Sequence, residues 1–481
     1  MILADYGRYD GLGLAELVRR REVSPADLVA SALDAIERLN PQVNCVVQTL
    51  RDTAQASIDA GLPHGPFRGV PFLVKEFGMH FEGMVASAGS RLAAGYRHGT
   101  DSVMMQRCRA AGLVAIGTTT VPEMAFNAST EALLYGPTRN PWNLEYASGG
   151  SSGGAGAAVG SGMVPIAHAN DGAGSIRIPA ACNGVVGMKV SRGRTPGGPD
   201  LGMLLWGLGV EFFETRSVRD SAAMLDCVAG EDAGCFYVAP PPRRSFLAAA
   251  HTPPQRLRVG VIEQLPGGCP TGAEQRARLA DTVRLLEGLG HRCEPLALEY
   301  DSEAFVTSTL PLWAVTLAHY MQRCARALSR TIDASNTEAV TLAIYRYALG
   351  LNALDLEEAM AVQNAITRHA VAAMAGYDVL LTPALARDVA RIGELDQNAS
   401  GVDMRAWWRQ IIQDYSPFTP LFNTTGQPAL MLPLWQADSG LPLAMQFVGR
   451  YGDEETLYSL AGELEQAQPW AARRPAHYAT R

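Results

Sequence analysis

The sequence predicts an α/β fold built on a parallel or mixed β-sheet. Between residues 13 and 119, apolar segments of strand length alternate with segments of helical periodicity, a pattern typical of βα units. The chain has 481 residues, of which 47% are hydrophobic and 18% are charged. This composition supplies a large core and has no signature of disorder.

The first elements have clear start and stop signals. Residues 13–40 have helical periodicity, and Ser24-Pro25 supplies an N-cap followed by a proline in the first turn. GVPFLVKE (69–76) predicts a short buried strand that ends in a lysine. MMQRCRAAG predicts a helix that ends at Gly112, and LVAIGTT the next strand.

The second half continues the alternation. Residues 238–255 are rich in proline and predict an exposed connection. Strands are expected at RLRVGVI (256–262) and at 377–386, 428–434 and 442–450, and helices at 273–290, 301–377 and 453–467. We expect one continuous domain over residues 1–481, with a helical cap from 301–377 as the alternative.

Composition excludes several classes of protein. The formal net charge is −8 and no basic block occurs, which disfavours a nucleic-acid partner. The eight cysteines form no CxxC pair and no Cys/His cluster at zinc spacing, so we expect reduced thiols and no metal. No signal peptide and no apolar run of membrane-spanning length is visible, so we expect a cytoplasmic protein.

A glycine- and serine-rich stretch, ASGGSSGGAGAAVGSGMVPIAHANDGAGSIRIPA (147–180), decides between functions. A phosphate-binding loop would need GxxxxGK[ST], and no lysine follows before Lys189. A flexible linker would lack the apolar interruptions AAV and MVPIA, and IRIPA (176–180) has strand character. The glycines therefore indicate tight turns where backbone amides converge.

One serine also fits a nucleophile elbow. Residues 149–153 satisfy GxSxG, which would make Ser151 the nucleophile of an α/β-hydrolase-type esterase. That mechanism needs a downstream acid and histidine, but His168 and the later histidines lie in no recognisable motif. We expect His168 to be a packed or hydrogen-bonded support residue.

Several segments closely resemble motifs of the amidase signature family. The central ones are GVPFLVKE, ASGGSSGGAGAAV and NDGAGSIRIPAACNGVVGMK. Others follow in the family's order: TTTVPEMAFNAST, TRNPWN, ETRSVRDSAAMLDCVAG, YDVLLTPALA, FTPLFNTTGQPALMLPL and PWAARRP. The resemblance covers roughly residues 10–475 and implies an α/β fold with a large mixed central sheet covered by helices on both faces. Within the family, the chain is most similar to 6-aminohexanoate cyclic-dimer hydrolases and related bacterial amidases.

The resemblance implies a Ser–Ser–Lys triad. The family's lysine falls on Lys75, its bridging serine on Ser151 and its nucleophile on Ser175, with a cis peptide bond at Gly150–Ser151. A lysine acts as a base only when neutral, and burial at the end of an apolar strand can lower its pKa from about 10.4 to near neutrality. We expect Ser152 to be a helix-capping turn serine.

The resemblance also places an oxyanion hole on the backbone amides of Gly172, Ala173, Gly174 and Ser175. Two positions depart from the family: Ala173 replaces a common glycine, and Glu76 a common aspartate. Neither change removes a backbone N–H. Asp171 and Arg177 have opposite charges, and we expect them to orient the loop as an ion pair.

Candidate substrate contacts are less well defined. Phe126 and Asn127 are suggested by the resemblance, and Trp313 by its place in the variable helical region. The apolar segment 197–214 offers Trp206, Phe212 and Phe213 as a pocket wall, with core packing as an equal alternative.

These observations predict a hydrolase that cleaves amide C–N bonds of a small, fairly apolar substrate through a Ser175 acyl-enzyme. We expect no cofactor, no metal, and a monomer or homodimer. Three alternatives remain open: an aryl carbamate or ester hydrolase on the same triad, the esterase with Ser151 as nucleophile, and a binding protein without catalysis.

Overall fold

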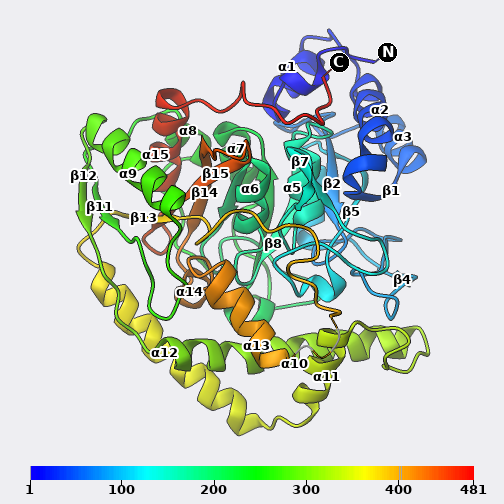
Figure 1. Cartoon of the computed structure of the whole chain (residues 1–481). Helices are drawn as coiled ribbons and strands as arrows, with labels where there is room; N and C mark the ends of the chain where they lie inside the picture. The colour runs from blue at the N-terminus through cyan, green and yellow to red at the C-terminus, as the bar shows by residue number, and fades with distance from the viewer. Residues whose placement is uncertain (1, 400, 402, 481) are drawn as a thin grey trace.

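The computed structural model describes residues 2–399, 401 and 403–480, and an 11-stranded mixed sheet runs through its centre (Figure 1). The strand order is β1-β5-β2-β8-β10-β9-β14-β15-β13-β11-β12. The strands of this sheet are β1 (Val46–Thr49), β2 (Pro71–Lys75), β5 (Val114–Thr119), β8 (Ile166–Asp171), β9 (Val186–Lys189), β10 (Val210–Thr215), β11 (Arg258–Val261), β12 (Arg292–Pro295), β13 (Val379–Pro383), β14 (Ala429–Gln436) and β15 (Pro442–Gly449). Two small ribbons pair β3 (Val85–Ala86) with β4 (Tyr96–Arg97) and β6 (Arg139–Asn140) with β7 (Asn143–Ala147).

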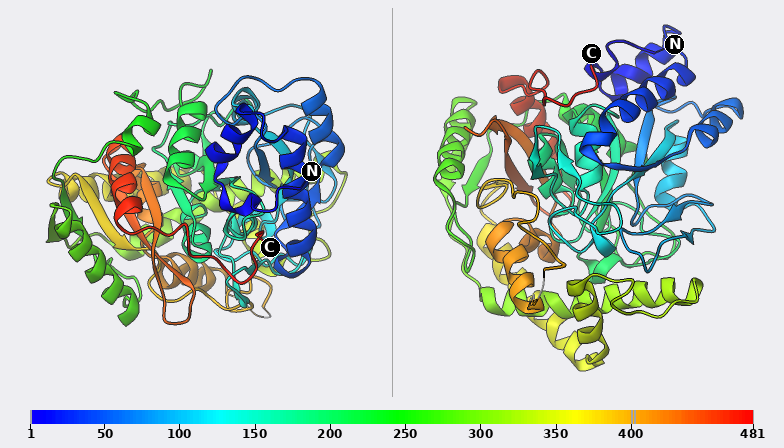
Figure 2. Two further views of the ribbon diagram at one scale, coloured as in Figure 1. Left: turned by 90° about the horizontal axis from the view of Figure 1, so that it is seen from above. Right: turned by 45° about the vertical axis from the view of Figure 1, so that its right-hand side comes forward.

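Helices cover both faces of this sheet (Figure 2). The α-helices are α1 (Gly11–Arg19), α2 (Pro25–Val43), α3 (Arg51–Asp59), α4 (Val103–Ala110), α5 (Gly153–Gly160), α6 (Arg177–Asn183), α7 (Val218–Val228), α8 (Phe246–Ala250), α9 (Ala273–Gly288), α10 (Ser302–Ala327), α11 (Ala339–Leu349), α12 (Ala353–Met374), α13 (Met404–Arg409), α14 (Pro420–Thr425) and α15 (Glu454–Ala467). α5 packs on α6, α7 packs on α15, and both pairs contact the central strands. The predicted fold class is confirmed.

The sheet is parallel where the candidate site lies and antiparallel next to it. β2 pairs in parallel with both β5 and β8, whereas β8 pairs antiparallel with β10. β2 and β8 therefore end at the same edge of the sheet, which brings Lys75 close to the turn that follows Asp171. Carboxyl ends of parallel strands are a common location for ligand sites.

The predicted start of α2 is present in full. The Ser24 side chain accepts a hydrogen bond from the Asp27 amide, and the Asp27 side chain accepts one from the Ser24 amide. This capping box, with Pro25 in the first turn, satisfies amides that the helix itself leaves unpaired.

One expectation about secondary structure was wrong. IRIPA (176–180) begins in the turn before α6 and continues into that helix, because a short buried apolar run suits a helix as well as a strand. Residues 210–215 form the buried strand β10, which agrees with core packing, the alternative to a pocket wall for this part of the segment. The proline-rich connection is mostly exposed, as expected, but it also contains the short helix α8, which the Ser245 side chain caps and whose Phe246 is buried against Tyr458.

The region 301–377 is largely helical, as expected. α10, α11 and α12 lie together at the lower edge of the molecule in Figure 1, and α10 packs on both of the others. Trp313, Leu317 and Tyr320 of α10 line the largest part of the candidate site, a cavity next to the ends of β2 and β8.

Candidate active site

Lys75 is the last residue of β2, and its side chain is fully buried. Its amine lies 2.8 Å from Ser151 Oγ, 2.8 Å from Ser152 Oγ and 2.6 Å from Asn170 Oδ1. Lys75 and Ser151 are therefore close together, as predicted. Ser152 and Asn170 are also hydrogen-bonded to the same amine.

Burial lowers the pKa of Lys75 from its usual value to about 7. The nearby carboxylates of Glu211, Glu214 and Asp171 act in the opposite direction, because a negative charge favours the ammonium form. The desolvation effect prevails, so a large fraction of this amine is neutral at physiological pH.

The turn before α5 carries two serines with different surroundings. The peptide bond Gly150–Ser151 is cis, as the family resemblance implied. Ser152 stands at the N-cap position of α5, but its side chain makes no capping hydrogen bond. Instead, Ser152 Oγ donates to the Asn170 carbonyl at 3.3 Å while it accepts from Lys75, so the expected capping role is corrected.

Ser175 lies in the turn between β8 and α6. The carboxylate of Asp171 holds this turn by accepting the amides of Gly174 at 2.7 Å and Ile176 at 3.2 Å. Arg177 pairs with the same carboxylate through Nε and Nη2, each at 2.9 Å. The predicted ion pair is present, and both side chains are completely buried.

The charge on Asp171 is stable in this position. Burial opposes ionisation, but the guanidinium of Arg177 prevails and holds the pKa of Asp171 at about 2. Arg177 also donates to Gln446 and Asn423, so all parts of the ion pair are hydrogen-bonded to the surrounding core. The turn that carries Ser175 is therefore rigidly supported.

The four predicted oxyanion donors are not equivalent. The Gly174 amide is already donated to Asp171, which removes it from the set. Within the described part of the chain, the amides of Gly172, Ala173 and Ser175 have no hydrogen-bond acceptor. A side chain at position 172 would collide with Leu205 and Trp313, so glycine is required where the backbone meets the cavity wall.

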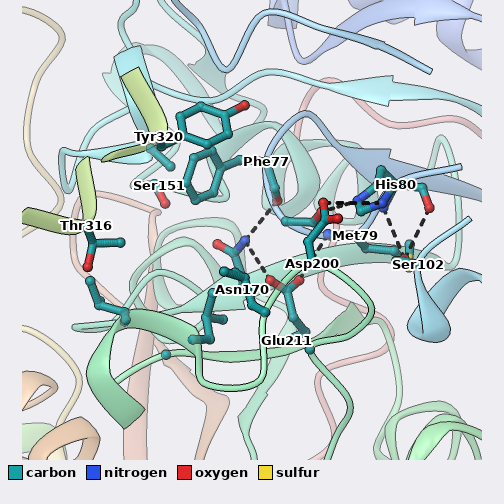
Figure 3. A pocket seen from close by; sticks show the side chains of 18 of the residues that line it. Phe77, Met79, His80, Ser102, Ser151, Asn170, Asp200, Glu211, Thr316 and Tyr320 are labelled. Carbon is teal, nitrogen blue, oxygen red and sulfur yellow. Dashed lines mark hydrogen bonds and ion pairs between the residues drawn. The ribbon is translucent and has the colours of Figure 1, made fainter. Parts of the chain in front are cut away.

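A cavity of about 160 Å³ opens over these groups (Figure 3). Its floor includes Ser151, Asn170, Gly172 and Ser175. Its walls are mainly apolar and come from α10, from the loop after β2 and from the segment before β10. Such a mostly apolar cavity with a few converging polar groups is typical of an enzyme site for a small molecule.

The structure brings some of the predicted substrate contacts to the site. Phe126 and Trp313 line the main cavity, with their ring centroids 5.3 Å apart. Asn127 lines a smaller adjoining cavity, and its Nδ2 donates to the Leu395 carbonyl at 2.7 Å.

Other predicted contacts are corrected. Phe212 and Phe213 are completely buried in β10, where Phe213 packs against His168. Trp206 packs with Leu205 and Leu208 and is not among the described residues that line either cavity. The segment does form a wall, but through the leucines 201, 204 and 205. Hydrophobicity alone could not distinguish a strand of the core from the loop that precedes it.

Sequence reasoning missed Asn170 and Glu211. Asn170 accepts from Lys75, and its Nδ2 donates to the Phe77 carbonyl at 2.8 Å. Glu211 faces Asn170 in the β8–β10 ladder and lies 2.6 Å from His168 Nε2. His168 is thus a support residue, as expected. The sequence could have indicated Asn170, because residues two apart in a strand, such as His168 and Asn170, point to the same face. Glu211 could not be found in this way, since it reaches the site only through the register of β10 against β8.

The elbow interpretation of Ser151 does not fit these contacts. In the described chain, the basic group within hydrogen-bond distance of Ser151 is Lys75, and His168 is instead paired with Glu211.

All eight cysteines are free thiols, as expected. Among the described residues, no helix is both long and apolar enough to cross a membrane.

Comparison with known proteins identifies the family of this chain. The family model described as "Amidase" matches residues 27–458. The chain is 35% identical to the 6-aminohexanoate-cyclic-dimer hydrolases of Pseudomonas sp. (strain NK87) and Paenarthrobacter ureafaciens, over 97% of this chain and 96% of each relative. A solved structure of 6-aminohexanoate cyclic dimer hydrolase superposes with a TM-score of 0.93 at 34% identity, covering 98% of this chain and 99% of that one. The chain therefore belongs to the amidase signature family of hydrolases, which act on amide bonds.

Proposed function

We propose that this enzyme hydrolyses the C–N bond of small, fairly apolar amides through an acyl-enzyme on Ser175, with Lys75 as the base and Ser151 as the proton relay. The observation that carries the proposal is the buried Lys75 amine, which has a pKa of about 7 and lies 2.8 Å from Ser151 Oγ. A serine hydroxyl is a weak nucleophile unless such a base takes its proton.

The hydrogen bonds around Lys75 give its lone pair a direction. Asn170 Nδ2 is engaged with the Phe77 carbonyl, so Asn170 Oδ1 faces the amine and accepts one of its hydrogens. Ser152 Oγ donates its own hydrogen to the Asn170 carbonyl and therefore accepts a second hydrogen from the amine. A neutral amine has two hydrogens and one lone pair, so the lone pair is left for the hydroxyl of Ser151.

The relay then follows from proton balance. Lys75 takes the proton of Ser151 while Ser151 takes that of Ser175, and Ser175 Oγ bonds to the substrate carbonyl carbon. The carbonyl oxygen becomes an anion that the free amides of Gly172, Ala173 and Ser175 can stabilise. The proton returns through Ser151 to the departing nitrogen as the C–N bond breaks. Water then attacks the Ser175 ester by the same relay and releases a carboxylic acid.

The relatives support an amide as the substrate. Two of them carry the name 6-aminohexanoate-cyclic-dimer hydrolase, and that compound is an amide. The apolar walls of the cavity here suit a substrate with little charge.

Labelling with a fluorophosphonate probe followed by peptide mapping tests the nucleophile. We expect the label on Ser175, and its loss in Ser175→Ala but not in Ser161→Ala, a buried serine at the end of α5. Label on Ser151 would show that Ser175 is not the nucleophile. A panel of amides, aryl carbamates and esters then ranks the bond types that the same triad can cleave.

A further inference from the structure

Two cavities meet at Ser175. The main cavity has a volume of about 160 Å³, and a second cavity of about 30 Å³ lies beside it. Ser175 lines both. A substrate that acylates this serine therefore has two separate spaces for the groups on either side of its carbonyl.

Aromatic rings separate the two spaces. Phe126 and Trp313 line both cavities, and Trp407 and Trp408 line the smaller one. The Phe126 ring stacks on Trp408, with centroids 5.2 Å apart and an angle of 6° between planes, and its centroid lies 5.4 Å from that of Trp407. Large rings packed on one another resist displacement, so the partition is a fixed wall.

The position of Ser151 decides which half of the substrate enters which cavity. The departing nitrogen receives its proton from Ser151, so the amine must lie on the side that this residue faces. Ser151 lines the main cavity and is not among the described residues that line the smaller one (Figure 3). The leaving amine therefore occupies the main cavity, and the acyl chain points into the smaller one.

The volumes then limit each half. A water-sized group needs about 10–15 Å³ by this measure, so the smaller cavity of about 30 Å³ holds about two such groups. The main cavity, at about 160 Å³, holds about ten. Its apolar wall includes Leu205 and Trp313, which both lie beside Gly172. His80 and Asp200 also line this cavity, on the side away from Ser151 in the view of Figure 3.

We propose that the enzyme selects amides that join a short acyl group, of about two or three carbons, to a longer and mainly apolar amine. The inference rests on the proposed function of Ser175 and Ser151. It differs from a preference for overall size, because it assigns a direction to the amide bond.

Two isomeric amides test the direction with the same atoms. N-hexylacetamide places two carbons on the acyl side and six on the amine side, whereas N-ethylhexanamide reverses them. We expect kcat/KM to be at least about 100-fold higher for N-hexylacetamide, since each excluded methylene in a tight pocket costs about tenfold or more. Equal rates, or a preference for N-ethylhexanamide, would overturn the inference.

Isomeric esters extend the test to a more reactive bond. Hexyl acetate and ethyl hexanoate should show the same order if the amides react too slowly to measure. Turnover that persists in Ser175→Ala would refute the proposed function itself, whereas a reversed preference that depends on Ser175 would refute only the assignment of the cavities. Absence of turnover for all four compounds would refute both.

Paired variants locate the selection in the smaller cavity. Ile411 lines that cavity, and Ile411→Ala enlarges it without removing an aromatic ring. We expect this variant to raise kcat/KM for N-ethylhexanamide relative to N-hexylacetamide by about tenfold or more. Leu204→Ala enlarges the main cavity instead and should leave the acyl-length preference in place. An equal change in both variants would contradict the assignment.

Discussion

Two buried lysines in neighbouring parts of the sheet have different surroundings. Lys75 at the end of β2 and Lys189 at the end of β9 are both almost completely buried, and burial lowers the pKa of each. Lys75 contacts two serine hydroxyls and an amide oxygen. Among the hydrogen bonds of the described chain, Lys189 donates only to the carbonyl of the adjacent Val190, at 3.1 Å.

Burial lowers the pKa of both amines, but burial alone does not make a lysine a catalytic base. The charge of Arg177 reinforces burial in lowering the pKa of Lys189, yet the hydrogen bond that this amine makes within the described structure goes to a backbone carbonyl and not to a hydroxyl. The amine of Lys75 lies 2.8 Å from the hydroxyl oxygen of Ser151, which lines the main cavity. A base therefore requires both a depressed pKa and a partner whose proton it can take.

The largest expected effect separates the two lysines by substitution. Lys75→Ala should lower kcat/KM by about 10³-fold or more, because removal of a general base usually costs 10²–10⁴-fold and the triad acts as a unit. Lys189→Met should lower it by less than about tenfold. Steady-state kinetics gives both values, and thermal denaturation checks that each variant is folded. Near-wild-type turnover by Lys75→Ala at neutral pH would eliminate the lysine mechanism.

The second prediction concerns the charges beside Lys189. Arg177→Met should reduce the free energy of unfolding by about 3–5 kcal/mol, because it leaves the buried carboxylate of Asp171 without its partner. Arg258→Met, which removes a half-exposed pair with Glu294, is the matched control and should cost less than about 1 kcal/mol. Urea denaturation measures both free energies of unfolding. Similar decreases in the two variants would show that the buried ion pair contributes no more to stability than the half-exposed one.

The third prediction concerns pH. In the proposed mechanism Lys75 acts only when neutral, so kcat/KM should be constant above its pKa of about 7 and fall tenfold per pH unit below it, to about 100-fold lower at pH 5. Lys189→Met should leave this acid limb unchanged. An acid limb that moves in Lys189→Met would show that the titrating group is not Lys75 alone.

The smallest expected effect concerns the charge of Glu211 and its influence on the pKa of Lys75. The carboxylate of Glu211 raises the pKa of Lys75 against the effect of burial. Glu211→Gln removes that charge, so the pKa should fall and the acid limb should move to lower pH, by about one unit or less. Glu294→Gln on the distant edge strand β12 is the control. A shift to higher pH would contradict the sign of this interaction.

Much of the fold could be predicted from the sequence because its signals are local. The capped start of α2, the apolar run of β2 and the helices of residues 301–377 depend on periodicity and on residues next to one another in the chain. β10 and the start of α6 could not be assigned, since short apolar segments look alike until their neighbours are known. The same limit applied to Phe212, whose burial results from pairing in the middle of the sheet.

Motifs that are contiguous in the chain identify the family and the positions of Lys75, Ser151 and Ser175. The surroundings of these three residues, in contrast, come from segments that are distant in the chain. Asn170 and Glu211 meet through strand register, and the Gly174 amide is engaged by Asp171. The Phe126 ring contacts Trp313 and Trp408, which lie about 190 and about 280 residues further along the chain. Such contacts depend on the packing of distant segments, which no local pattern records.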